Sequence, residues 1–209
     1  MALSAERGFV HWTAQAIALR GWALAKRGQG EEGIVQIHQG LTAYQATGAE
    51  LARPLFLGLL AEAYGKTGRA EEGLTVVTEA LAAAHKNGQQ LWEAWLYRLR
   101  GELMLQQSKV QSPKSKIDIP HSAFRFGLDL PLAMHSEAEA CFRQAIDLTR
   151  RQSAKSLELR AVMNLSRLWH QQGKTKEAQR LLAETYGWFT EGFDTADLRE
   201  AKVLLEELS

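Results

Sequence analysis

A six-residue motif recurs in this chain at a fixed step, each time between amphipathic segments. It reads Gly-Gln-Gly-Glu-Glu-Gly at 28–33, Gly-Arg-Ala-Glu-Glu-Gly at 68–73 and Gly-Lys-Thr-Lys-Glu-Ala at 173–178. The first two copies begin 40 residues apart. A repeat of this length predicts a solenoid, because a single helical hairpin cannot bury its apolar face and must stack on a neighbouring copy.

Small residues place the repeats in register, because two antiparallel helices cross closely only where side chains are small. In the first helix of each repeat the small residues are Gly21, Ala61, Gly101 and Ser166. In the second helix they are Gly33, Gly73, Ala138 and Ala178. The first series advances by 40, 40 and 65 residues, and the second by 40, 65 and 40. Both series agree if one 40-residue repeat carries 25 extra residues between its helices, between about Ser108 and Ser136.

The second repeat shows a pattern similar to the tetratricopeptide repeat (TPR). Its matching residues are Leu57, Leu60, Ala61, Tyr64, Gly68, Gly73, Val77 and Ala80. The other repeats match in part; the fourth has Ser166, Trp169, Gly173 and Ala178. The resemblance implies an all-α fold, a right-handed α-solenoid of about four TPR-like helical hairpins with a C-terminal capping helix.

On this register, residues 1–209 are expected to form a single solenoid. The expected repeats are 11–48, 49–88, 89–152 and 155–187, with an insertion at 109–135 inside the third and a capping segment at 188–209. Residues 1–8 are expected to be the end of an earlier helix, so that the chain is part of a longer solenoid.

Three C-terminal segments, 137–146, 168–173 and 186–198, resemble the C-terminal repeat region of large bacterial signalling ATPases. Proteins of that family begin with an adenylate or guanylate cyclase domain, or with a DNA-binding domain of the transcriptional-activator type. An ATPase module and a helical-repeat tail follow. The resemblance implies that this chain is such a tail, and that upstream domains of the same polypeptide are among its partners.

Composition limits the classes of partner. The formal net charge is +1, so the sequence predicts no nucleic-acid partner. The single cysteine cannot form an internal disulfide and is consistent with the cytoplasm. No apolar stretch reaches the roughly 18 residues of a spanning helix, and no signal peptide is recognisable, so no membrane association is expected.

Several motifs resemble catalytic or cofactor-binding signatures without their context. Residues 28–33 match the dinucleotide-binding Gly-x-Gly-x-x-Gly, but here the motif joins two helices and carries acidic residues where the anion belongs. Two Gly-Lys-Thr triplets lack the earlier glycine of a P-loop. The six histidines include no pair at i, i+4, and Cys141 reads as a packing residue. The sequence therefore predicts no catalytic residue, cofactor or metal site, and no enzyme.

The TPR resemblance places a groove along the first helices of the repeats. The groove residues expected to bind a partner are Trp22, Glu62, Trp95, Arg98, Glu102, Arg160, Arg167 and His170. The arginines suit an acidic or phosphorylated segment, and the tryptophans suit an apolar anchor. The alternative is that the arginines pair with Glu62, Glu102 and Glu158 along a solvated face.

The insertion at 109–135 differs from the rest of the chain by its prolines, which argue against continuous helix. One hypothesis is a short arm in which Phe124 and Phe126 pack on a partner or on the solenoid. The other is a loop tolerated because loop-closure entropy grows slowly with length.

Two functions remain open at this point. The first is a protein-interaction or regulatory module, with a protein or peptide, an upstream domain or a second copy of the chain as partner. The second is a module that senses a small ligand and controls an attached effector, an inference by analogy of fold. A closed apolar pocket near Trp22, Trp92 and Trp95 would favour ligand sensing, and an open groove would favour protein binding.

Overall fold

The computed structural model describes the backbone of residues 9–86, 88, 90–111 and 124–209, and the side chains of these ranges except 111 and 124–131. The expectation for residues 1–8 therefore falls outside the described residues. Within the described ranges every regular element is a helix. The helices are α2 (Val10–Lys26), α3 (Gly30–Ala46), α4 (Arg53–Lys66), α5 (Ala70–Lys86), α6 (Gln90–Gln111), α7 (Phe124–Arg151), α8 (Lys155–Gln171), α9 (Thr175–Tyr186) and α10 (Ala196–Glu207).

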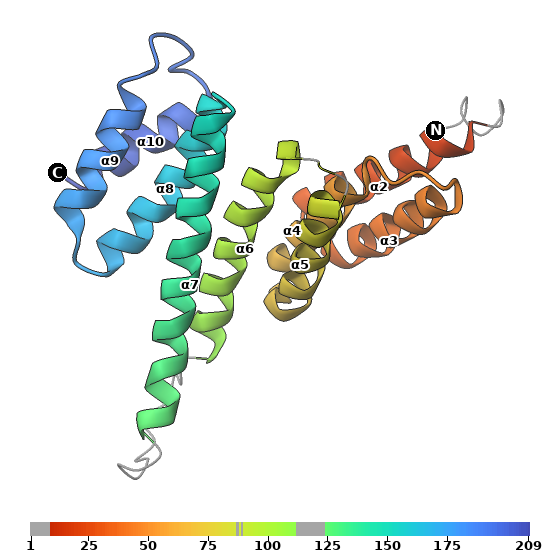
Figure 1. The fold of residues 1–209 in the computed structure, drawn as a ribbon, viewed down its shortest axis with the longest axis horizontal. Coiled ribbons are helices and arrows are strands. Elements are labelled where there is room, and N and C mark those ends of the chain that lie inside the picture. Colours follow the sequence, from red (N-terminus) through yellow and green to blue (C-terminus); the bar gives the residue numbers. More distant parts are fainter. Residues whose placement is uncertain (1–8, 87, 89, 112–123) are drawn as a thin grey trace.

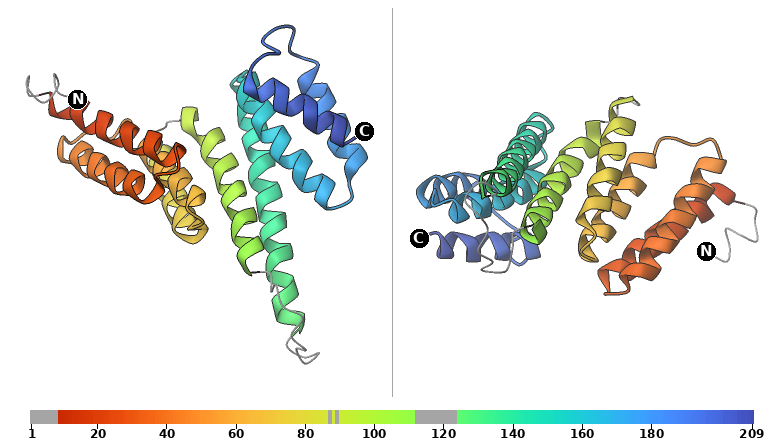
Figure 2. Two further views of the ribbon diagram at one scale, coloured as in Figure 1. Left: turned by 180° about the vertical axis from the view of Figure 1, so that it is seen from behind. Right: turned by 90° about the horizontal axis from the view of Figure 1, so that it is seen from below.

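Consecutive helices form the hairpins α2–α3, α4–α5, α6–α7 and α8–α9, followed by α10 (Figures 1 and 2). The first helix of each hairpin contacts the first helix of the next, so that α2, α4, α6, α8 and α10 form a continuous row. The second helices α3, α5, α7 and α9 make no such contacts with one another in the described part of the chain. This arrangement confirms the predicted all-α solenoid of helical hairpins with a capping helix.

The recurrent glycine ends the first helix of its hairpin. Gly28, Gly68 and Gly173 have φ of 90°, 78° and 79°, the left-handed region that glycine enters without steric cost. The amide of the following residue donates to a carbonyl five residues back, as in Gln29 N to Leu24 O at 3.0 Å. This is the Schellman pattern of a helix C-terminus. The motif at 28–33 therefore joins two helices, as the sequence predicts: Gly28 and Gln29 lie in the turn after α2, and residues 30–33 form the first turn of α3.

The small residues of the register lie at the helix crossings. A Cβ on Gly21 would stand 2.6 Å from the Gly33 carbonyl oxygen, and one on Gly33 would stand 2.5 Å from the Gly21 oxygen. In the last hairpin the Ser166 hydroxyl donates to the Ala178 carbonyl at 3.3 Å. These contacts show why the two helices of a hairpin carry small residues at matching positions: the backbones themselves touch.

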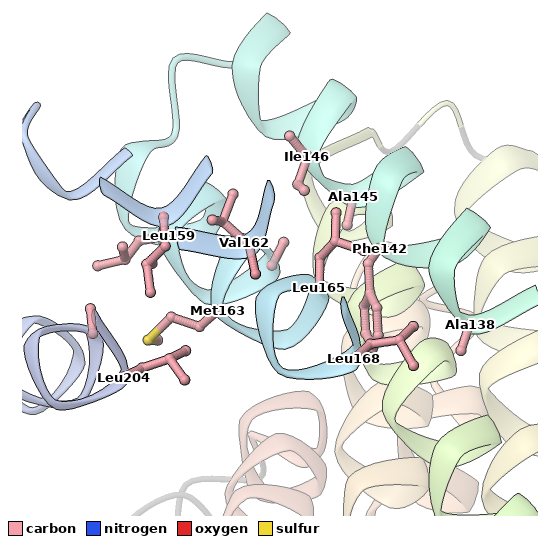
Figure 3. Packing of buried hydrophobic residues seen from close by; sticks show 14 of the residues in the cluster. Ala138, Phe142, Ala145, Ile146, Leu159, Val162, Met163, Leu165, Leu168 and Leu204 are labelled. Atoms are coloured by element: carbon pink, nitrogen blue, oxygen red, sulfur yellow. The ribbon is translucent and has the colours of Figure 1, made fainter. Parts of the chain in front are cut away.

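The core runs the length of the row and is continuous through α6. A cluster in the first half includes Phe56, Leu96 and Leu103, and a second cluster, shown in Figure 3, joins Phe142 on α7 to α8 and α10. The half-buried Leu74 and Tyr97 pack against both clusters. The two halves of the solenoid are therefore fixed relative to one another, which gives the row of first helices a defined surface.

The described ends of the insertion are helical. Within 109–135, α6 extends to Gln111 and α7 already begins at Phe124, while residues 112–123 lie outside the described residues. α7 runs through Pro131, so the prediction that proline argues against continuous helix is wrong there. Proline removes one backbone hydrogen bond at a cost of about 3 kcal/mol. A helix of 28 residues retains its other bonds and its packed part around Phe142.

Candidate functional site

The candidate site is the surface of the row α2, α4, α6, α8 and α10. Because each of these helices contacts the next, side chains one repeat apart in sequence become neighbours in space. A cavity of about 390 Å³ opens on this surface. It is lined by Lys26, Glu62, Arg98, Glu102, Arg160, Met163, Asn164, Arg167, Asp197 and Glu200. Five of the eight predicted groove residues meet in it: Glu62, Arg98, Glu102, Arg160 and Arg167.

Glu62 is the centre of the first group of contacts. Its carboxylate accepts a hydrogen bond from Trp22 Nε1 at 2.9 Å and forms an ion pair with Lys26. The Lys26 ammonium also lies 5.2 Å from the centre of the Trp22 ring. The predicted groove residue Trp22 is thus beside the cavity, and its polar edge is directed at Glu62.

Glu102 holds the middle of the groove. It pairs with Arg98 one turn earlier on α6 and accepts a hydrogen bond of 2.5 Å from Asn164 Nδ2 on α8. The Arg98 side chain is only 17% exposed, and its Nε has no hydrogen-bond partner among the described residues. Glu102 therefore fixes two first helices against each other while Arg98 stays at the groove floor.

The C-terminal end of the groove is held by α10. Arg160 pairs with Asp197 at 2.8 Å, and Arg167 pairs with Glu200 at 2.7 Å. The sequence analysis expected Glu62, Glu102 and Glu158 as the alternative partners of the groove arginines, so Asp197 and Glu200 are different partners from those expected. Of those three acids, Glu102 does pair with a groove arginine, Arg98.

Glu158 lies instead at the joint between α7 and α8, almost completely buried. Its carboxylate accepts hydrogen bonds from Arg150 Nε at 2.7 Å and from Lys155 Nζ at 2.8 Å. Burial alone raises the pKa of this carboxyl, but the hydrogen bonds from the two cations outweigh burial, so its pKa lies below the usual value. Glu158 therefore stabilises the joint and takes no part in the groove.

Lys26, Asp197 and Glu200 are groove residues that the sequence reasoning missed. The sequence does contain a signal that could have identified them. Each of these residues has an oppositely charged residue 33 to 37 positions away, close to one repeat length, and pairs with it in the structure. The cavity lining holds Lys26, Arg98, Arg160 and Arg167 against an equal number of carboxylates. This cavity is therefore lined by equal numbers of positive and negative side chains.

A second cavity of about 380 Å³ adjoins the first and shares Glu62, Glu102, Asn164 and Arg167 with it. Its remaining lining includes Leu99, Leu103, Leu105, Phe142 and Leu168. Phe142 and Leu168 belong to the packed cluster of Figure 3. The groove thus becomes partly apolar between α6 and α8.

Trp95 lies away from both cavities and covers Gly58. A Cβ on Gly58 would stand 2.4 Å from the Trp95 ring, so only glycine admits the indole at this place on α4. Trp92 packs edge-on against Trp95, with ring centres 6.4 Å apart. Trp92 also lines an apolar hollow of about 400 Å³ with Leu51 and Leu91, which are 74% and 65% exposed. This hollow lies at the surface, and the lining residues described for it include neither Trp22 nor Trp95.

The remaining predicted site residues lie elsewhere. His170 is exposed at the end of α8, where its Nδ1 is 3.0 Å from the Thr175 hydroxyl oxygen at the start of α9. Phe124 and Phe126 are in the first turn of α7, and their side chains lie outside the described part of the chain. The predicted arm residues therefore remain a sequence-based prediction.

Three further properties can be considered for the described residues: metal binding, membrane crossing and thiol accessibility. Among the described residues no three His, Cys, Asp or Glu side chains cluster as metal ligands. No helix in the described ranges is long and apolar enough to cross a bilayer. Cys141 is buried on α7, and this burial raises the pKa of its thiol.

No protein-family model matches the sequence, and no curated protein matches it. Among solved structures the chain is similar to a Podosopora anserina putative kinesin light chain with nearly identical TPR-like repeats. A single-residue variant of that protein is 17% identical over 83% of this chain and 92% of its own, with a TM-score of 0.40. A second structure of it is 18% identical over 83% and 93%, with a TM-score of 0.38. At these scores, the description of this chain as an α-solenoid rests on its own helix contacts.

Proposed function

We propose that this chain is a non-catalytic protein-interaction module that holds an extended polypeptide segment in the groove along α2, α4, α6, α8 and α10. The observation that supports this proposal is the open cavity on this surface. Its lining combines four carboxylates with four cations, the carboxylates being those of Glu62, Glu102, Asp197 and Glu200. A bound ligand must replace the ion pairs between these side chains with ion pairs of its own. A peptide segment that carries both positive and negative side chains can pair with the carboxylates and with the cations of the groove. This favours a mixed-charge peptide over a polyanion or a purely apolar anchor.

The experiment selects binders from a displayed library of random peptides, then measures their affinity by fluorescence anisotropy. The test variant is Arg98→Gln, at the groove floor, and the matched control is Arg143→Gln, an exposed arginine on α7 that pairs with Glu139. We expect the groove variant to weaken binding about tenfold, which corresponds to about 1.4 kcal/mol. The control should bind as the wild type does. Failure to select any peptide, or equal effects of the two variants, contradicts the proposal.

The resemblance of segments 137–146, 168–173 and 186–198 supports a more specific context. In this context the module belongs to a bacterial signalling ATPase or cyclase of the cytoplasm, and its partner is a protein or an upstream domain of the same polypeptide. The DNA sequence upstream of the codon for Met1 tests this. A reading frame for an ATPase or cyclase is the expected result, and an unrelated upstream gene contradicts this context while leaving the groove proposal intact.

Small-ligand sensing has less support as a function. The most apolar hollow described, beside Trp92, is formed by side chains as exposed as Leu51 and Leu91. Sites for small molecules bury most of the ligand surface, which a hollow at the surface does not do.

A further inference from the structure

The second groove cavity, between α4, α6 and α8, has unpaired positive charge. Its two carboxylates, Glu62 and Glu102, already form ion pairs with cations that line the first cavity. Its cation Arg167 is paired with α10. Its other two cations are Lys66 in the last turn of α4 and Lys109 in the last turn of α6. Both lysines are exposed, and within the described ranges neither forms an ion pair or a side-chain hydrogen bond.

The repeat register indicates which partner Lys66 lacks. On α2, Lys26 pairs with Glu62 of α4, 36 residues later in the chain. One repeat further, the equivalent residues are Lys66 on α4 and Glu102 on α6, which are also 36 residues apart. This second pair is absent from the contacts of the described residues. The same cation is therefore paired in one repeat and, in the described structure, unpaired in the next.

The carboxylate of Glu102 is already used by two other side chains. Arg98, four residues earlier on the same helix, pairs with it, and Asn164 on α8 donates a hydrogen bond of 2.5 Å. Four residues before Glu62 stands Gly58 instead, which has no side chain to pair with a carboxylate. The lysine at the end of α4 is therefore left beside a carboxylate whose charge is already compensated.

We propose that Lys66 and Lys109 bind acidic side chains of the segment that the groove holds. This inference rests on the proposed function and adds an order of charges to the segment: acidic residues lie over the ends of α4 and α6, and residues of both charges lie toward α10. Charge complementarity supports it, because the first cavity has equal numbers of positive and negative side chains while the second has two unpaired cations. A carboxylate held inside a cavity is also less screened by water than one at an open surface.

Peptides selected on the full chain test this inference by fluorescence anisotropy. Each selected peptide is also made with one acidic residue at a time changed to its amide. Lys66→Gln should weaken binding of the parent peptide about fivefold, and one of the amide replacements should abolish that effect. Lys66→Gln combined with Lys109→Gln should weaken binding about tenfold. The matched control is Lys176→Gln, which changes an exposed lysine on α9 that lines neither groove cavity and should bind as the wild type does.

Charge reversal gives a second readout. Lys66→Glu should bind a peptide with lysine in place of the paired acidic residue more tightly than the wild type binds that peptide. Selected peptides without acidic residues, an effect of Lys66→Gln that is the same for every amide replacement, or variants of Lys66 and Lys109 that bind as the wild type does while Arg98→Gln is weakened, overturn this inference and leave the proposed function intact. Failure to select any peptide contradicts both. Circular dichroism confirms that each variant is folded.

Discussion

The indole Nε1 of Trp22 donates a hydrogen bond of 2.9 Å to Oε2 of Glu62, a residue 40 positions later in the chain. The bond joins α2 to α4 in the row of first helices. Its sequence separation is one repeat, so it links equivalent helices of consecutive hairpins. The groove surface is thus built from contacts between neighbouring repeats, and its stability and its shape depend on the same side chains.

A double-mutant cycle with Trp22→Phe and Glu62→Leu should show this link. Trp22→Phe removes the donor and Glu62→Leu removes the acceptor, so we expect a coupling of about 1 kcal/mol in the free energy of unfolding. Urea denaturation provides the measurement. A parallel cycle of Trp22→Phe with Glu79→Leu on α5 should be additive within about 0.5 kcal/mol. Equal coupling in the two cycles would show that the Trp22 bond contributes nothing specific.

Gly21→Ala should destabilise the protein by about 2 kcal/mol, although alanine is the better helix former. The added Cβ would stand 2.6 Å from the Gly33 oxygen and 2.7 Å from the Ile37 nitrogen, both backbone atoms that cannot turn aside. Overpacking of this kind costs more than the gain of about 1 kcal/mol in helix propensity. Urea denaturation measures the change. At the control site Gly65 the nearest atom is the Leu103 Cδ2 at 2.8 Å, the end of a side chain, so Gly65→Ala should cost less.

Ser153→Gly should stabilise the protein by about 1 kcal/mol. Ser153 ends α7 with φ of 55°, the positive angle that glycine takes at Gly173, and Ala154 N donates to Thr149 O at 2.9 Å in the same pattern. A side chain in this region is strained, and glycine is not. The reverse change Gly173→Ser should lower stability by a similar amount, because no atom lies within 4 Å of a Cβ there and only the backbone angle is affected. Thermal denaturation of both variants measures these changes. A lower stability of Ser153→Gly would contradict the claim that the positive φ of Ser153 is strained.

Glu158→Gln should lower stability at pH 7 by about 2 kcal/mol, because Arg150 and Lys155 lose their charged partner. The folded-state pKa of Glu158 is lowered, so its contribution is fully present above the unfolded value of about 4.3 and is lost as pH falls through the folded value. The difference between wild type and variant should therefore shrink below about pH 4.3.

Thermal denaturation between about pH 3 and 7 covers this change. The control Glu206→Gln alters an exposed carboxyl on α10 and should follow the wild-type profile. A difference between wild type and Glu158→Gln that stays constant with pH would contradict the role assigned to the Glu158 carboxylate.

Much of the fold was predictable because its determinants are local and periodic. The glycines at 28, 68 and 173 mark helix ends, and the small residues at 21 and 33 mark a crossing, since each acts through backbone geometry within one hairpin. Pro131 shows the limit of such reasoning: its local preference is against helix, and α7 nevertheless continues through it. A local preference of about 3 kcal/mol is outweighed here within a helix of 28 residues, most of which follows the proline.

The groove was predictable only in part. The sequence by itself determined which residues lie on the exposed face of the first helices, because residues three or four positions apart lie on the same face of a helix. Only the tertiary structure decided the partners of the charges: Arg160 meets Asp197 and Arg167 meets Glu200, on a helix expected to serve only as a cap. Ion pairs depend on distances set by how successive helices stack, and this stacking is fixed by the contacts between neighbouring repeats and by no single repeat.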